Sequence, residues 1–89
     1  MPRVVFTANL QRHISAPPSE APGPTVRAAL EAVFATNPRL RSYVLDDQGR
    51  VRHHVVVFVG GQRIKDPAGL SDLVSESDEI FVMQSLAGG

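Results

Sequence analysis

The sequence predicts a small α+β domain in which one main helix packs on a sheet of four or five strands. Three observations lead to this class. One segment has helical periodicity, several short segments are rich in β-branched residues, and turn-forming residues separate them. With 89 residues, we expect one domain with a single modest core.

The first strand is expected at residues 3–8, because "RVVFTA" is rich in β-branched and aromatic residues. The following "NLQRH" predicts a turn, and "HISA" predicts a short partner strand. Next comes "PPSEAPGP", which holds four prolines and a glycine in eight residues. This segment predicts a loop that passes over the end of the sheet.

The helix is expected over residues 25–37, "TVRAALEAVFATN". Its apolar residues recur at intervals of three and four positions, which places them on one face of a helix: Val26, Ala29, Leu30, Val33 and Phe34. Thr25 is the candidate N-cap, and Pro38 is expected to end the helix.

The C-terminal half predicts mainly β-structure. The stretch "YVLDDQGRVRHHVVVFV" predicts two extended pieces around the turn "DDQG", and "GGQRI" predicts a tight glycine hairpin into a short strand. Residues 66–78 predict a loop with one helical turn near residues 70–73. Residues 79–84, "EIFVMQ", predict the last strand.

Strand alternation leaves apolar side chains on two faces of the sheet, and one helix covers only one face. If Ile80 and Val82 point to the helix, their neighbours point away. The side chains expected on the open face are Val56, Phe58, Phe81 and Met83. Either residues 43–53 or a second copy of the chain covers this face, or it is an exposed patch that binds a partner.

Composition excludes several classes of function. Nine cationic and nine anionic residues balance, without a basic block, so we expect neither nucleic acid nor a membrane surface as a partner. Cysteine is absent, which excludes disulfides, thiolate metal sites and cysteine nucleophiles. The start "MPRVVFTANL" lacks the long apolar segment of a signal peptide, so a cytoplasmic location is expected.

Histidines and acidic pairs do not predict a metal or catalytic site. His53 and His54 are adjacent, so on a strand they would point to opposite faces, and His13 lies far away in the sequence. The acidic pairs sit beside turn residues, where carboxylates bend and cap the backbone. We therefore expect no metal, no bound cofactor and no catalytic residue.

The chain ends on "SLAGG", with Gly88 and Gly89 directly after the expected last strand. Glycine packs nothing and loses the most conformational freedom on ordering, so stability does not explain this ending. Together with the element order, the glycine hairpin and the "SDEI" turn before the last strand, it resembles the β-grasp, ubiquitin-like sulfur carriers. That family includes the molybdopterin-synthase small subunit and the thiamine-biosynthesis carrier. Within it, "DDQGRVRHHVVVFVGGQRI" is most similar to the cysteine-biosynthesis carrier.

This resemblance implies a β-grasp domain over residues 1–85 and a flexible Gly-Gly tail over residues 86–89. It implies that a ubiquitin-activating-type adenylyltransferase uses ATP to adenylate the Gly89 carboxylate, which Gly88 helps to thread into the partner. A sulfurtransferase donor would then form a thiocarboxylate, and a synthase would accept the sulfur. Leu86 and Ala87 would insert with the tail. The four open-face side chains would dock on the activating enzyme, and the chain itself would be a co-substrate without enzyme activity.

Two departures from the family pattern concern the choice of subfamily. Gln84 and Ser85 stand where many relatives have a proline-containing segment, and Ser77 stands where many have glycine. Two other functions stay open: a protein modifier joined through Gly89 to lysines, and a β-grasp interaction module whose glycines are incidental. The accepting pathway also stays open among molybdopterin, thiamine, cysteine and a sulfur-containing secondary metabolite.

Overall fold

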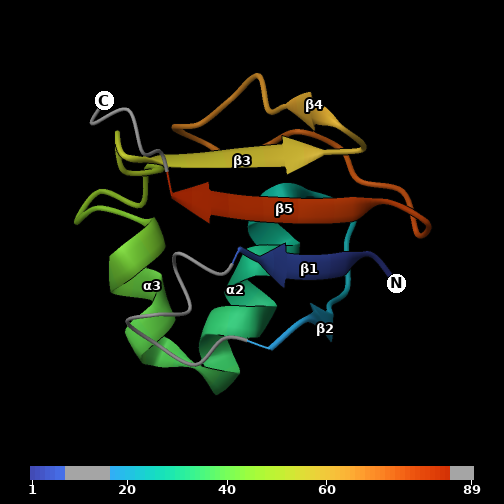
Figure 1. Ribbon diagram of the computed structural model, residues 1–89, viewed down its shortest axis with the longest axis horizontal. Helices are drawn as coiled ribbons and strands as arrows, with labels where there is room; N and C mark the ends of the chain where they lie inside the picture. Colours follow the sequence, from blue (N-terminus) through green and yellow to red (C-terminus); the bar gives the residue numbers. More distant parts are fainter. Residues whose placement is uncertain (8–16, 85–89) are drawn as a thin grey trace.

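The computed structural model describes residues 1–7 and 17–84 of the chain. Five strands form one mixed sheet in the order β2-β1-β5-β3-β4, and both helices lie on the same side of it (Figure 1). The elements are β1 (Arg3–Phe6), β2 (Ser19–Glu20), α2 (Val26–Thr36), α3 (Pro38–Val44), β3 (Val55–Val59), β4 (Gln62–Arg63) and β5 (Glu79–Gln84). The predicted α+β class is confirmed.

The last strand lies in the middle of the sheet. β5 has the predicted bounds and pairs in parallel with β1 and antiparallel with β3. β1 ends at Phe6, although the Thr7 amide still donates to the Val82 carbonyl at 3.1 Å. The predicted "NLQRH" turn and "HISA" strand lie outside the described residues.

The strand beside β1 arises inside the segment that was predicted to be only a loop. Ser19 and Glu20 are non-proline residues within the proline-rich stretch, and they pair antiparallel with Val4 and Arg3. The pairing is extended by a 2.9 Å hydrogen bond from the Ala21 amide to the Pro2 carbonyl. The short strand uses two non-proline residues of this stretch. The prolines around them do not prevent the pairing, because proline is tolerated at sheet edges.

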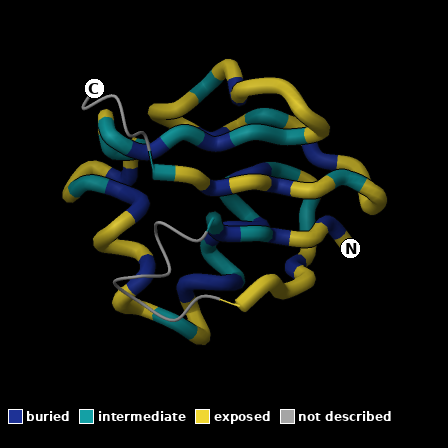
Figure 2. Tube along the Cα trace, viewed as in Figure 1, coloured by how far each residue is buried: buried dark blue, intermediate teal, exposed yellow. Residues whose placement is uncertain are grey.

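Helix α2 confirms the predicted helix. The hydroxyl of Thr25 accepts a 3.2 Å hydrogen bond from the Ala28 amide, so Thr25 is the N-cap. All five residues of the predicted apolar face are buried. They belong to one hydrophobic core with the inward residues of β1, β3 and β5. Figure 2 colours the buried positions along the chain dark blue.

A second helix replaces the expected extended structure after Pro38. Pro38 ends α2, as predicted, but it also begins α3, because proline fits the first turn of a helix. Leu40 and Val44 are buried four positions apart, so the expectation that residues 43 and 44 are extended was wrong. Before the "DDQG" turn, only Leu45 keeps an extended pairing, an isolated bridge to Val51, whereas the piece after the turn contains strand β3, as predicted.

The turn between β3 and β4 is the predicted glycine turn, whereas the loop between β4 and β5 differs from the prediction. Gly60 and Gly61 have φ angles of 57° and 84°, which suit the two-residue turn between β3 and β4. The helical turn expected near residues 70–73 was wrong. Residues 67–69 form the turn instead, and Leu70 is buried with a positive φ of 57°. No helix of the described residues is long and apolar enough to cross a membrane.

Candidate docking face and start of the tail

The two faces of the sheet differ as the alternation predicts. Ile80 and Val82 are completely buried under the helices, whereas Phe81 and Met83 are 36% and 37% exposed on the other face. In β3, Val55 and Val57 are likewise buried. The prediction of which side chains point to the helices is confirmed, and their proposed docking role stays a prediction.

Strand register brings the open-face side chains together. Phe58 lies directly opposite Phe81, and Val56 lies opposite Met83. On its other side, Phe81 lies opposite Val5 of β1. Directly opposite residues of neighbouring strands share a face and interact. We call these five residues the apolar face: Val5, Val56, Phe58, Phe81 and Met83.

Val5 was missed in the sequence because the pairing of β1 with β5 was not known. Alternation along β1 places Val5 on the open face, since Val4 and Phe6 on either side of it are buried. The first suggested cover for this face, residues 43–53, lies instead at the end of the sheet where β3 begins (Figure 1). Phe81 and Met83 therefore remain exposed within the described part of the chain.

The end of β5 places the start of the C-terminal segment. Gln84, the last described residue, lies opposite Val55, the first residue of β3. Met83 of the apolar face is its immediate neighbour. The predicted tail residues lie outside the described part of the chain: Leu86, Ala87, Gly88 and Gly89.

His53 and His54 were expected on a strand, but they occupy a turn just before β3. Their rings pack edge to face, with centroids 5.3 Å apart and planes at 83°. Within residues 1–7 and 17–84, no group of three or more His, Cys, Asp or Glu side chains could hold a metal ion.

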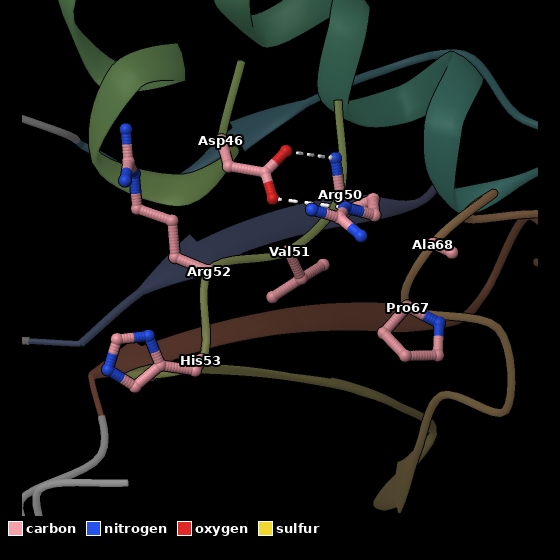
Figure 3. A pocket seen from close by; sticks show the side chains of 7 residues that line it. All are labelled: Asp46, Arg50, Val51, Arg52, His53, Pro67 and Ala68. Atoms are coloured by element: carbon pink, nitrogen blue, oxygen red, sulfur yellow. Dashed lines mark hydrogen bonds and ion pairs between the residues drawn. The ribbon is translucent and has the colours of Figure 1, made fainter. Parts of the chain in front are cut away.

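Asp46, one of the acidic residues considered for acid–base catalysis, lies at the start of a turn. Asp46 borders an open hollow of about 390 Å³ beside Arg50 and Pro67 (Figure 3). One oxygen of Asp46 accepts from the amides of Gln48 and Arg50 at 2.9 and 3.0 Å, and the other pairs with Arg50 Nε at 3.1 Å. The backbone hydrogen bond from Arg50 is the largest cause that lowers the pKa of Asp46. This carboxylate organises the "DDQG" turn and stays ionised, so it is not a poised general acid.

A similar arrangement holds the loop that follows β4. Asp66 accepts hydrogen bonds from the Ser71 hydroxyl at 2.6 Å and from the Gly69 amide at 2.9 Å. Arg27 of α2 reaches across to the same loop and donates to the Gly69 carbonyl at 3.0 Å. It also donates to the Gly49 carbonyl at 2.8 Å, so one side chain ties both loops to the helix.

No protein-family model and no curated protein matches the chain, but several solved structures do. The small archaeal modifier protein 1 from Methanosarcina acetivorans is 22% identical with a TM-score of 0.79, over 98% of this chain and 94% of that one. A chain in the BexX/CysO complex from Amycolatopsis orientalis is 20% identical with a TM-score of 0.82, and both chains are covered completely. CysO from Mycobacterium tuberculosis is 17% identical with a TM-score of 0.80, over 97% of this chain and 100% of that one.

These structures share the arrangement of strands and helices over almost the whole chain. The predicted β-grasp fold is therefore confirmed, with a mixed five-stranded sheet and a second helix in addition to the main one. The chain has the ubiquitin-like β-grasp fold of CysO and of the small archaeal modifier protein.

Proposed function

We propose that this protein is a sulfur carrier that works through the carboxylate of Gly89 and has no enzyme activity of its own. One observation carries the proposal beyond the fold: Phe81 and Met83 of the apolar face are exposed within the described part of the chain, and this face reaches the end of β5, after which the C-terminal residues follow. A partner that covers Phe81 and Met83 is thus in place to receive the residues after Gln84. Glycine has no side chain to pack, so stability does not explain Gly88 and Gly89, and this role does.

The chemistry requires two steps on the Gly89 carboxylate. A carboxylate oxygen attacks the α-phosphorus of ATP, and the bond to pyrophosphate breaks, which leaves an acyl-adenylate. A sulfur nucleophile then attacks the acyl carbon, and the bond to AMP breaks. With a persulfide donor the product is an acyl disulfide; a thiolate of the donor system then attacks its donor-side sulfur and breaks the S–S bond, which leaves a thiocarboxylate on Gly89 and a disulfide on the donor.

The chain contributes placement to this chemistry, while the activating enzyme supplies the catalytic groups. Gly88 and Gly89 bring no side chain into a narrow nucleotide pocket and allow backbone angles that other residues avoid. Leu86 and Ala87 offer the last side chains for the partner to hold. The apolar face anchors the domain, so that the binding of the folded part positions the reacting carboxylate.

The absence of cysteine fits this role. The chain contains two methionines and no cysteine, so neither a persulfide nor an internal thioester can form on it. A thiocarboxylate on Gly89 would be the one sulfur nucleophile of the protein, because methionine sulfur is a thioether. The partner proteins, and not residues of this chain, determine which synthase accepts the sulfur and in which pathway.

A protein modifier is the second candidate function, and the likeness to a small archaeal modifier protein favours it. In that case the activated Gly89 forms an isopeptide bond with lysines of other proteins. Lys65 is the only lysine of this chain, so self-conjugates could branch at that residue or at the N-terminus. Both functions use the same adenylation step.

Adenylation is tested by ATP–pyrophosphate exchange with the ubiquitin-activating-type enzymes of the host. We expect exchange with the full chain and none with a variant that lacks Gly88 and Gly89. A Leu73→Ala variant keeps the tail and serves as the control, because Leu73 lies outside the apolar face and is 78% exposed. Partner binding that survives the loss of both glycines, with no exchange by either chain, would identify an interaction module instead.

A further inference from the structure

Charged residues lie at two edges of the apolar face. Arg63 of the edge strand β4 is directly opposite Phe58, so it shares the face that Phe58 presents. It therefore extends the cross-strand row that runs through Val5, Phe81 and Phe58. Arg63 is exposed, and it forms no ion pair with any described residue.

A row of the opposite net charge runs from the other edge strand, β2, across β1 to the central strand β5. Arg3 of β1 lies between two acidic residues in the register, Glu20 of β2 and Glu79 of β5. All three side chains are exposed, and together they carry one net negative charge. This row is two residues along the strands from the row that contains Phe81 and Arg63.

The spacing of the two edges follows from sheet geometry. Strands lie about 4.8 Å apart, so Arg63 on β4 and Glu20 on β2 are separated by roughly 19 Å across the sheet. Two residues along a strand add about 7 Å in the perpendicular direction. The apolar face thus has a cation at its β4 edge and a net negative row at the end of the sheet where β1 and β5 begin.

We propose that this charge pattern sets the orientation in which the activating enzyme binds, an inference that rests on the proposed function. The partner presents an apolar surface with a carboxylate opposite Arg63 and a basic side chain opposite Glu20 and Glu79. Apolar contact is non-directional, so it holds the domain without choosing its rotation. Charges at the rim favour one rotation and disfavour the reversed one, in which like charges meet. The correct rotation directs the end of β5 toward the nucleotide pocket.

Charge reversal tests this inference in the ATP–pyrophosphate exchange assay. Arg63→Glu is expected to raise the KM for the carrier about tenfold with kcat changed less than about twofold, because rim charges act mainly on association. The effect should shrink in about 0.5 M salt, where the Debye length is only a few ångströms. Arg39→Glu is the matched control, since Arg39 is an exposed residue of α3 on the helix side. It should leave KM within about twofold.

A double reversal separates orientation from net charge. Arg63→Glu combined with Glu20→Arg keeps the formal charge of the chain at zero but inverts the pattern. We expect its KM to be higher than that of either single variant. A KM restored to the wild-type value would overturn the inference, and so would equal KM values for Arg63→Glu and Arg39→Glu. Thermal unfolding of each variant confirms that these exposed positions leave the fold intact.

The assay distinguishes failure of this inference from failure of the proposed function. If the wild-type chain supports exchange and the reversals change nothing, the charge pattern has no role while the carrier function stands. If the wild-type chain supports no exchange with any activating enzyme of the host, the proposed function is wrong and this inference is wrong with it.

Discussion

Replacement of Phe81 by alanine probes the apolar face at its centre. Phe81 lies between Val5 and Phe58 in the register and is 36% exposed. A partner that covers this face buries the exposed third of the ring. Aromatic side chains bury roughly 150–250 Å², so about 70 Å² of Phe81 is available to the partner.

The expected loss of binding follows from that area. At about 25 cal/mol per Å², covering about 70 Å² contributes roughly 1.8 kcal/mol. This corresponds to about a 20-fold loss of affinity for Phe81→Ala. The fold also loses the cross-strand contacts of the ring, which costs about 1 kcal/mol of stability and leaves the domain folded.

ATP–pyrophosphate exchange, measured against the concentration of this protein, reports this loss as a higher KM. Leu73→Ala is the control, because it removes a side chain that is 78% exposed and lies in the loop between β4 and β5. The control should change KM less than about twofold. Equal KM values for Phe81→Ala and Leu73→Ala would refute the assignment of the apolar face as the docking surface.

Three further predictions concern the fold. Leu30→Ala removes a completely buried side chain of α2 and should lower the free energy of unfolding by about 2–5 kcal/mol in urea titrations. Gly61→Ala should cost about 1–2 kcal/mol in the same measurement, because the new Cβ meets no atom within 4 Å but φ is +84°. The pKa of Asp66 lies below its ordinary value of 3.8, chiefly because of the Ser71 hydroxyl hydrogen bond. Its stabilisation is therefore complete above the unfolded-state pKa and is lost as pH falls through the lowered folded-state value, so Asp66→Asn should flatten the acid limb of stability against pH.

The elements that rest on local patterns were predictable from the sequence. Helix α2 has an N-cap, a full apolar face and a proline that stops it, and β5 is a run of β-forming residues after a turn. Helix α3 was missed because Pro38 was interpreted only as a stop signal. Proline is equally suited to begin a helix, and the buried pair Leu40 and Val44 carried the helical spacing.

The candidate site was predictable in part. Alternation along β3 and β5 identified which side chains face away from the helices, because that property is local to each strand. It could not identify Val5 or Arg63 as members or neighbours of the same surface. Those assignments depend on the parallel pairing of β1 with β5 and on the register of the β3–β4 hairpin. Such non-local pairings arise only in the folded sheet.

The most direct test of the carrier function is the mass of the protein purified from its native host and treated, while unfolded, with a thiol alkylator. The chain has no cysteine, so an adduct on the C-terminal peptide identifies a thiocarboxylate on Gly89. We predict this adduct in protein whose intact mass shows that the chain still ends at Gly89. Unmodified protein that ends at Gly89, and that stays unmodified with the activating enzyme, ATP and a sulfur donor, would contradict the account. Linkage of Gly89 to lysines of other proteins would identify a modifier instead.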